Sequence, residues 1–198
     1  MMKVRFITES SEYLGDVDNG LAGGGRPIRL LDALNFPRRL RPEVKLDSPV
    51  MSIAHGIRTD RVTGVEAAVP VNLWLALDRI IGAFEDPWIE WSNPVASYER
   101  QSISRVFRVQ LYMLGDFLIE GNVHTKHVTA GFLRDSTKFR AFTDVIFQDL
   151  KTEAPYRRMP FMAINTELVE SWTVSELATE AVVSQQVGRF DQPQVAVN

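Results

Sequence analysis

The sequence predicts a mostly β or α+β protein made of two small β-rich lobes in tandem. Short segments in which apolar and polar residues alternate recur along the chain, and this is the pattern of half-buried strands. Features of the first half also recur in the same order in the second half. A chain of 198 residues, 45% of them hydrophobic, can bury one core or two small ones. We therefore expect each lobe to be either a strongly bent sheet or a small barrel, with one short helix.

Residues 1–84 are expected to form the first lobe. Residues 3–10 alternate as a strand does, and "YLGDVDN" predicts its antiparallel partner, with a bulge or a close backbone approach at Gly15. Leu31 and Leu34 lie at helical spacing and predict a short helix, which the following "NFP" should end because a residue before proline is pushed away from helical angles.

The rest of the first lobe is predicted to be strands, with one ambiguous stretch. "EVKLDSPVMSIAHGI" has the alternation of a strand and is broken at Pro49. The stretch "VEAAVPVNLWLALDRIIGAF" at residues 65–84 fits both a pair of strands and a helix, because Leu73 and Leu77 suit either period, and the ambiguity is greatest at residues 72–84. We favour two strands broken near Asn72.

A linker of residues 85–105 separates the first lobe from the second, which spans residues 106–175. The linker holds prolines and tryptophans and shows no sustained periodicity. "FRVQLYML" and "DFLIEGNVH" then predict a hairpin across a tight Gly-Asp turn. Further strands are expected at residues 145–150, 160–164 and 168–174, with a turn at Asn165, and residues 176–198 are expected to be a polar tail.

The two lobes are expected to be divergent copies of one unit, related by a pseudo-twofold axis. Three pairs of segments match: "LGDV" with "EGNV", "RLLDAL" with "AFTDVI", and "PVNLWLAL" with "AINTELVE". These pairs place Gly15 opposite Gly121, and Asn72 opposite Asn165. The alternative is that two β-rich halves contain similar hairpins by chance. The shared order of the features favours duplication.

One half of the chain also resembles a known type of domain. A strand, an "xGxV" strand, a helix-like "RLxDxLN" and a closing "VN" turn follow one another in the first half, carried by Val4, Phe6, Gly15, Arg29, Leu30, Asp32, Leu34, Asn35, Val71 and Asn72. With these residues the chain resembles a small bacterial domain of unknown function, which we picture as an Sm-like or related small β-barrel. In the second half the resemblance keeps Gly121, Asp144, Val145, Ile164 and Asn165. The resemblance implies a small barrel for each lobe and no particular activity.

The composition excludes several classes of function. The net charge is −3, so no overall field draws the chain to nucleic acid or to an anionic membrane. The absence of cysteine excludes disulfides, thiolate metal sites and cysteine nucleophiles. No stretch reaches the roughly 18 uninterrupted apolar residues of a membrane span, and no signal peptide is recognised at the N-terminus. We expect a soluble, cytoplasmic protein with no membrane contact.

No motif predicts catalysis, a cofactor or a metal ion. "GLAGGGRP" lacks the Lys-Ser/Thr pair of a phosphate-binding loop, and a flexible turn explains it better. His124 and His127 lie three residues apart in an expected loop without a third ligand at defined spacing. No nucleophile elbow or pair of catalytic carboxylates is found. We therefore predict no catalytic, cofactor-binding or metal-binding residues.

Two features indicate surfaces for a partner. A basic patch consists of Arg38, Arg39, Arg41 and Lys45, in a stretch from residue 26 to 45 that holds six basic and two acidic residues. It suits a nucleic acid, a nucleotide or an acidic protein, and it is also what a solvated surface looks like. In the linker, Trp88 and Trp91 are large apolar side chains suited to packing against a domain or a partner.

These observations support three hypotheses. The first is a non-enzymatic structural or protein-interaction module, either an adaptor or a self-assembling subunit, for which a protein partner or self-association is expected. The second is a nucleic-acid or nucleotide-binding module that uses the basic patch; nucleic acid is not the favoured partner, because contact between a basic first lobe and an acidic second lobe explains the charges equally well. The third is a small-molecule enzyme in a cleft between the lobes, for which the sequence shows no polar pocket.

Overall fold

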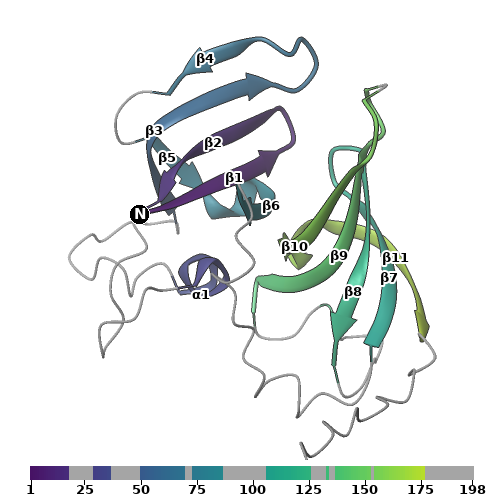
Figure 1. Cartoon of the computed structure of the whole chain (residues 1–198). Helices are drawn as coiled ribbons and strands as arrows, with labels where there is room; N and C mark the ends of the chain where they lie inside the picture. Colours follow the sequence, from purple (N-terminus) through teal and green to yellow (C-terminus); the bar gives the residue numbers. More distant parts are fainter. Residues whose placement is uncertain are drawn as a thin grey trace, which may run out of the picture.

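The structure is a computed structural model, and it describes residues 1–17, 29–36, 50–69, 73–86, 106–125, 133, 137–152 and 154–176. Within these residues the protein consists of antiparallel strands and one α-helix (Figure 1), so the predicted mostly β class is confirmed. In the first half the elements are β1 (Met2–Thr8), β2 (Ser11–Val17), α1 (Leu30–Asn35), β3 (Val50–Asp60), β4 (Glu66–Ala68), β5 (Leu73–Ala76), the 3₁₀ helix η2 (Leu77–Arg79) and β6 (Ile80–Glu85). In the second half they are β7 (Val106–Met113), β8 (Phe117–His124), β9 (Phe139–Asp149), β10 (Arg157–Asn165), the 3₁₀ helix η5 (Thr166–Leu168) and β11 (Val169–Glu176).

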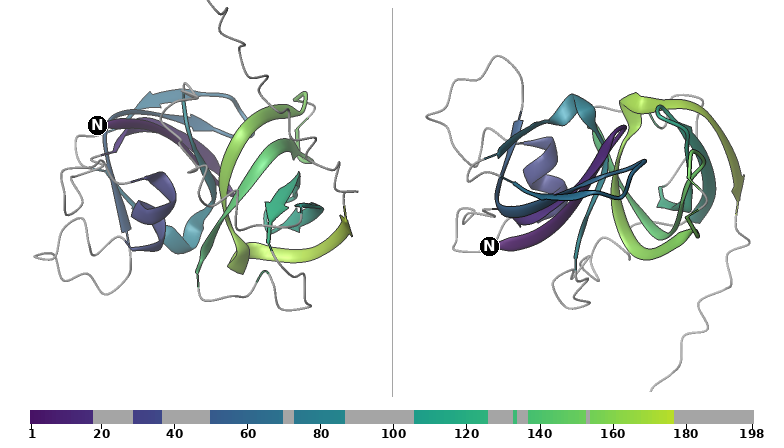
Figure 2. Two further views of the ribbon diagram at one scale, coloured as in Figure 1. Left: turned by 60° about the horizontal axis from the view of Figure 1, so that its bottom comes forward. Right: turned by 90° about the horizontal axis from the view of Figure 1, so that it is seen from above.

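The described strands form one antiparallel sheet that runs through both halves. Its order is β11-β7-β8-β9-β10-β6-β1-β2-β3-β4, and β5 pairs with the first part of β3. The halves join where β10 pairs with β6, through Ala163 opposite Ala83 and Ile164 opposite Gly82. The sheet curves strongly in each half (Figure 2), but among the described strands it does not close into a barrel. Of the two forms expected for each lobe, the Sm-like small barrel is therefore wrong, and a strongly bent sheet describes the halves better, although they share one continuous sheet.

The strands of each half pair in the same order. This order is β6-β1-β2-β3-β5 in the first half and β11-β7-β8-β9-β10 in the second. Gly15 in β2 lies at a register shift against β3, where His55 has a φ of 47°, and Gly121 in β8 lies at a register shift against β9, where Asp144 has a φ of 49°. A Cβ on Gly15 would lie 2.2 Å from Cγ2 of Ile53. The predicted bulge and close backbone approach at Gly15 are confirmed.

Two of the three segment pairs proposed from the sequence are wrong. "RLLDAL" covers α1, whereas "AFTDVI" lies within β9, so a helix was matched with a strand. Asn165 immediately precedes η5 as Ala76 immediately precedes η2, so the two 3₁₀ helices place Asn165 level with Ala76 and not with Asn72, which lies outside the described residues. The preference for strands over a helix in residues 72–84 is confirmed by β5 and β6, although η2 makes the break between them.

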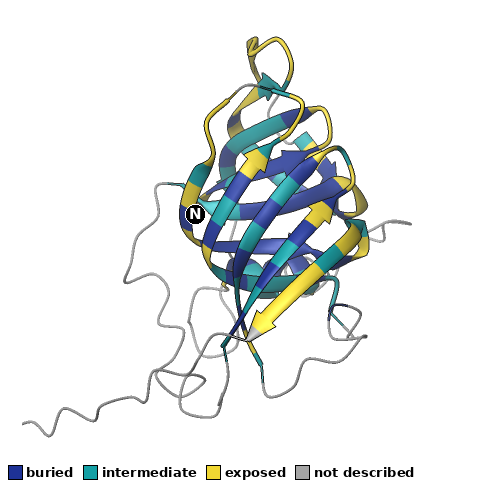
Figure 3. Ribbon diagram, turned by 90° about the vertical axis from the view of Figure 1, so that its right-hand side faces the viewer, coloured by how far each residue is buried: buried dark blue, intermediate teal, exposed yellow. Residues whose placement is uncertain are grey.

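Two apolar cores lie on the two faces of the central strands. On β1, the adjacent residues Phe6 and Ile7 are both fully buried, and because successive side chains of a strand point to opposite faces they enter different cores. The core of the first half, which contains Phe6, also includes Leu30 and Leu34 from α1. Each core includes residues from both halves: Ile7 and Ile81 join the core of the second half, and Phe139, Phe161 and Ala163 join that of the first. In Figure 3 buried residues lie mainly in the middle of the molecule, and exposed ones lie on the turns and on the outermost strand.

The expected linker of residues 85–105 lies almost wholly outside the described residues, so the division into two lobes at this point stays a prediction. Strand β6 ends at Glu85 and β7 begins at Val106, and residues 87–105 lie outside the described part of the chain. The predicted turn between β7 and β8 is confirmed, since Gly115 and Asp116 both have positive φ. Among the described residues no helix is long and apolar enough to cross a membrane.

Candidate functional site

A cleft of about 460 Å³ opens where the two halves meet, and we call it the Trp74 cleft. The first half supplies most of its wall, from the β1–β2 turn, β2, β5, η2 and β6, and the second half supplies one residue of the β7–β8 turn and one of η5. Its volume lies within the roughly 300–1,000 Å³ of typical ligand pockets. The cleft is lined by Thr8, Glu9, Ser10, Tyr13, Trp74, Leu75, Ala76, Asp78, Arg79, Ile81, Leu114 and Leu168.

Local structure explains why polar side chains reach this cleft. In the β1–β2 turn, the hydroxyl of Thr8 donates to the carbonyl of Ser11 (2.8 Å) and accepts from its N–H (3.2 Å), which closes the turn and leaves Glu9 and Ser10 exposed at its tip. In η2, Leu77 is buried, so the next two residues of this tight turn are exposed.

Strand alternation brings an aromatic side chain to the same cleft. Leu75 of β5 is buried, so its neighbour Trp74 points to the other face and is 44% exposed. The apolar part of the wall comes from Leu75, Ile81, Leu114 and Leu168. The N–H of Leu114 donates to the carbonyl of Leu168 (2.9 Å), and this bond fixes the β7–β8 turn against η5. The second half therefore contributes Leu114 and Leu168, whose backbones are joined by a hydrogen bond.

Six side chains of the lining carry polar atoms that bond to no other described residue. They are Glu9, Ser10, Tyr13, Trp74, Asp78 and Arg79. By contrast, the guanidinium groups of Arg5, Arg61 and Arg157 all form ion pairs. Unpaired donors and acceptors that converge on a cleft of ligand size are available to a bound molecule.

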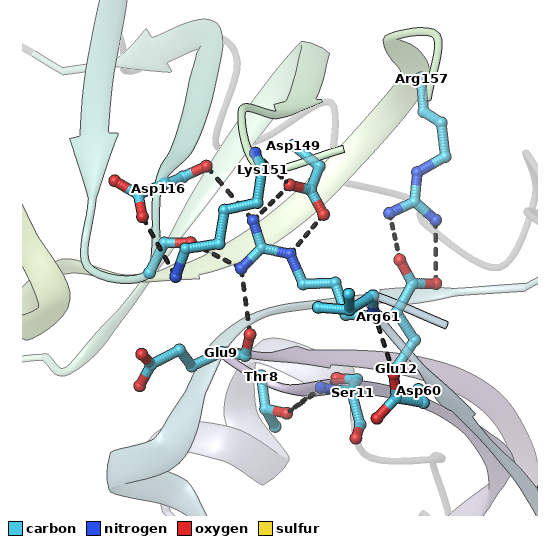
Figure 4. A network of polar contacts seen from close by, with 12 residues as sticks. Thr8, Glu9, Ser11, Glu12, Asp60, Arg61, Asp116, Asp149, Lys151 and Arg157 are labelled. Atoms are coloured by element: carbon cyan, nitrogen blue, oxygen red, sulfur yellow. Dashed lines mark hydrogen bonds and ion pairs between the residues drawn. The ribbon is translucent and has the colours of Figure 1, made fainter. Parts of the chain in front are cut away.

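A buried arginine lies beside the cleft and joins the two halves (Figure 4). Arg61 follows β3, its side chain is only 4% exposed, and its guanidinium pairs with both carboxylate oxygens of Asp149 at the end of β9. The same guanidinium donates to the carbonyls of Glu9 (3.0 Å), Gly115 (2.6 Å) and Asp116 (3.4 Å). It also lies 3.6 Å from the centre of the Phe117 ring. We call Arg61 with these five partners the Arg61 cluster.

The Arg61 cluster keeps its carboxylate ionised. Burial raises the pKa of Asp149, but the hydrogen bonds from Arg61 and from the backbone N–H of Lys151, together with the Arg61 charge, outweigh burial. The net result is a pKa below the ordinary value for aspartate. The Arg61–Asp149 pair is therefore charged at neutral pH.

A second ion pair joins the halves away from the cleft lining. Arg157 of β10 donates to both oxygens of Glu12 in β2, at 2.5 and 3.0 Å, and lies 4.9 Å from the centre of the Phe147 ring. Glu12 also pairs with Arg5 at 3.2 Å. Neither Arg157 nor Glu12 lines the Trp74 cleft. Arg61 and Arg157 thus both link the two halves, and of these two only Arg61 bonds to residues of the cleft wall.

The cleft carries groups for binding more than groups for catalysis. Its lining contains no histidine, so the hydroxyls of Thr8 and Ser10 have no imidazole base beside them. Over the described ranges, no group of three histidine, aspartate or glutamate side chains is placed to hold a metal ion. Aromatic faces, leucines and unpaired hydrogen-bonding groups are suited to recognition of a ligand.

The structure does not describe the site residues that the sequence predicts. Arg38, Arg39, Arg41, Lys45, Trp88 and Trp91 all lie outside the residues that the structure describes. His124, expected in a loop, is the last residue of β8, with Nε2 2.9 Å from Oγ1 of Thr143, and His127 lies outside the described residues. The sequence reasoning missed Trp74, although a tryptophan that alternates with two leucines in "LWL" was a signal for an exposed aromatic on a strand.

Comparison of the whole chain with protein-family models, with curated proteins and with solved structures finds no match.

Proposed function

We propose that the protein is a non-enzymatic protein-interaction module that binds an extended segment of a partner protein in the Trp74 cleft. One observation carries this proposal: six side chains whose polar atoms bond to no other described residue line a cleft whose remaining wall is largely apolar. Such a combination of apolar surface and a few placed polar groups is typical of a binding site.

The polar groups match the needs of a peptide backbone. The indole N–H of Trp74, the hydroxyl of Tyr13 and the guanidinium of Arg79 can donate to peptide carbonyls, and the carboxylates of Glu9 and Asp78 can accept from peptide N–H groups or pair with a basic side chain. An extended segment has no internal hydrogen bonds, so its backbone groups are free to use these partners. The leucines and aromatic faces provide apolar contact for its side chains.

The charge of the lining favours a peptide over a nucleic acid. One arginine stands against two carboxylates, Glu9 and Asp78, which gives the lining a net charge of −1. Nucleic acids are held mainly by several lysines and arginines on their phosphates. The alternative function, binding of nucleic acid or a nucleotide by Arg38, Arg39, Arg41 and Lys45, stays a prediction because those residues lie outside the described part of the chain.

The proposal is tested by selection from a displayed library of random peptides on the full chain. Selected peptides are then titrated against the wild type and Trp74→Ala, with Tyr156→Ala as the control, since Tyr156 is 58% exposed and does not line the cleft. Loss of a tryptophan at the centre of an interface costs about 2 kcal/mol or more, which is roughly a 30-fold weaker affinity. We expect this loss for Trp74→Ala and no more than about a twofold change for the control. Equal binding to both variants, or no selected peptide, contradicts the proposal.

The same preparation tests the other predicted partners. Salt-sensitive binding of mixed RNA, lost when Arg38, Arg39 and Arg41 are changed to alanine, would support the nucleic-acid alternative in place of a peptide. Multi-angle light scattering over a range of protein concentrations tests self-association. The cytoplasmic location is a prediction from the sequence that these measurements do not address.

We further infer that the two halves are divergent copies of one small β-rich unit of the type that the first half resembles. The common pairing order, the 3₁₀ helix before the last strand of each half, and the equivalent places of Gly15 and Gly121 support this inference. Superposition of the strands of the two halves in an experimental structure tests it. A pseudo-twofold relation requires a single rotation that places β1, β2, β3, β5 and β6 on β7, β8, β9, β10 and β11, and strands that do not overlay would contradict duplication.

A further inference from the structure

We propose that Arg61 is a positioning residue of the Trp74 cleft. It holds together two turns, one from each half, that contribute to the cleft wall, and it does so without contacting the bound segment. The inference rests on the proposed function, because it assigns a role in that binding to a residue outside the lining. The contacts of the Arg61 cluster carry it.

The first of these turns is the one between β1 and β2. The backbone N–H of Arg61 donates to the carbonyl of Ser10 (3.0 Å), and its guanidinium donates to the carbonyl of Glu9 (3.0 Å). Both Glu9 and Ser10 line the cleft. Arg61 therefore binds two successive carbonyls of this part of the wall.

The second turn is the one between β7 and β8. The guanidinium of Arg61 donates to the carbonyl of Gly115 (2.6 Å), the residue after Leu114, which lines the cleft. The two turns are in close contact, because a Cβ built on Gly115 would lie 3.0 Å from Cγ of Glu9. One nitrogen, Nη1 of Arg61, donates to Glu9 and to Gly115, so it bridges the turns directly.

An arginine is needed for this arrangement. Its planar guanidinium has five N–H donors, which here serve a carboxylate in the second half and carbonyls on both turns, while one face lies over Phe117. A lysine has a single nitrogen with three donors and cannot pair with both oxygens of Asp149 and reach both turns. We therefore expect Arg61→Lys to resemble Arg61→Ala in its effect on the cleft.

Arg157 offers a matched control in the same chain. Like Arg61, it pairs with a carboxylate across the two halves and lies over a phenylalanine ring. Unlike Arg61, it bonds to no residue of the cleft lining. Arg157→Ala thus removes a comparable link between the halves and should leave the cleft wall in place.

A measurement without ligand tests whether Arg61 holds the walls. Because the chain has no cysteine, spin labels can be placed at Glu66→Cys and Glu170→Cys, two exposed positions in different halves outside the cleft. Double electron–electron resonance then reports the distribution of distances between the halves. We expect a broader distribution in Arg61→Ala than in Arg157→Ala. Equal distributions in these two variants would overturn the inference.

A binding measurement tests whether the contacts of Arg61 with the two turns affect the affinity of the cleft for a peptide. The probe is the tightest peptide selected from the displayed library, titrated at a temperature at which circular dichroism shows each variant folded. We expect Arg61→Ala and Arg61→Lys to bind at least about tenfold more weakly and Arg157→Ala to stay within about twofold of the wild type. If Arg61→Ala does not fold, Arg61→Lys and Asp149→Asn provide the same comparison.

The two proposals fail in different ways. If Trp74→Ala weakens binding and the Arg61 variants do not, the positioning role is wrong and the proposed function stands. If Trp74→Ala has no effect, the proposed function is wrong, and the binding part of this inference falls with it. If the Arg61 and Arg157 variants weaken binding equally, Arg61 acts only through general stability, which also overturns the positioning role.

Discussion

Asn165 links the end of the second half to the first half, and its replacement tests how the halves are joined. The residue is fully buried and precedes η5. Its Nδ2 donates to the carbonyls of Leu77 (3.3 Å), the first residue of η2, and of Ile80 (3.0 Å), the residue after η2. Its Oδ1 accepts from the N–H of Glu167 (3.1 Å). One side chain therefore stabilises the 3₁₀ helices of both halves.

We expect Asn165→Ala to lower the free energy of unfolding by about 2–4 kcal/mol. Three hydrogen bonds are lost, each with a net value of about 0.5–1.5 kcal/mol, and buried partners are left unpaired. The carbonyl of Leu77 still accepts from the N–H of Ile80 in the variant. Loss of its hydrogen bond from Asn165 should therefore cost about 0.5 kcal/mol, the lower limit for one bond. The assay is equilibrium unfolding in urea, in which a lower midpoint at unchanged slope shows a change in stability alone.

Two further variants make this prediction specific. Asn122→Ala removes one partly buried asparagine, whose Oδ1 accepts from Arg108 at 3.1 Å, and should cost about 1 kcal/mol or less. Asn165→Asp keeps an acceptor for Glu167 but loses both N–H donors and buries a charge next to two carbonyls, so at neutral pH it should destabilise at least as much as alanine. The reasoning is refuted if Asn165→Ala stays within about 0.5 kcal/mol of the wild type, or if Asn165→Asp is the milder of the two.

Two more predictions concern the bulges and the Arg61 cluster. Gly15→Ala should lower the free energy of unfolding in urea by about 1–3 kcal/mol, because its Cβ would lie 2.2 Å from the buried Ile53. Gly121→Ala should lower it by about 1 kcal/mol or less, because the nearest contact of its Cβ would be 3.2 Å away. An equal loss of stability at both sites would contradict this reasoning. The folded-state pKa of Asp149 lies below its ordinary value of 3.8, so its stabilising effect is present above that pH and is lost as the pH falls through the lower folded-state value. Unfolding of Asp149→Asn should accordingly show a lower stability at neutral pH and a weaker dependence on pH in the acid range, and a dependence like that of the wild type would count against the pairing with Arg61.

Part of the candidate site was within reach of the sequence and part was not. An aromatic between two leucines in "LWL" indicates an exposed side chain on a strand, and "LDR" places two charges together. Nothing local to these segments indicates that Glu9, about seventy positions earlier, or Leu114 and Leu168 of the other half would share their cleft. Residues that are close in sequence, such as the basic patch at residues 38–45, are easy to find. The Trp74 cleft is instead assembled from four separate segments of the chain, and only tertiary contacts define it.

Several local features of this protein can be predicted from its sequence alone. Alternation defined β1, β7 and β8, the "NFP" motif marked the end of α1, Gly-Asp marked the β7–β8 turn, and Gly15 marked a bulge, because each depends on the backbone preferences and periodicity of a few neighbouring residues. The tertiary structure alone decided that β10 pairs with β6, that the cores exchange residues, and that Arg61 spans two turns. These features depend on which buried faces and unpaired strand edges meet across the whole chain, and no local pattern specifies that choice.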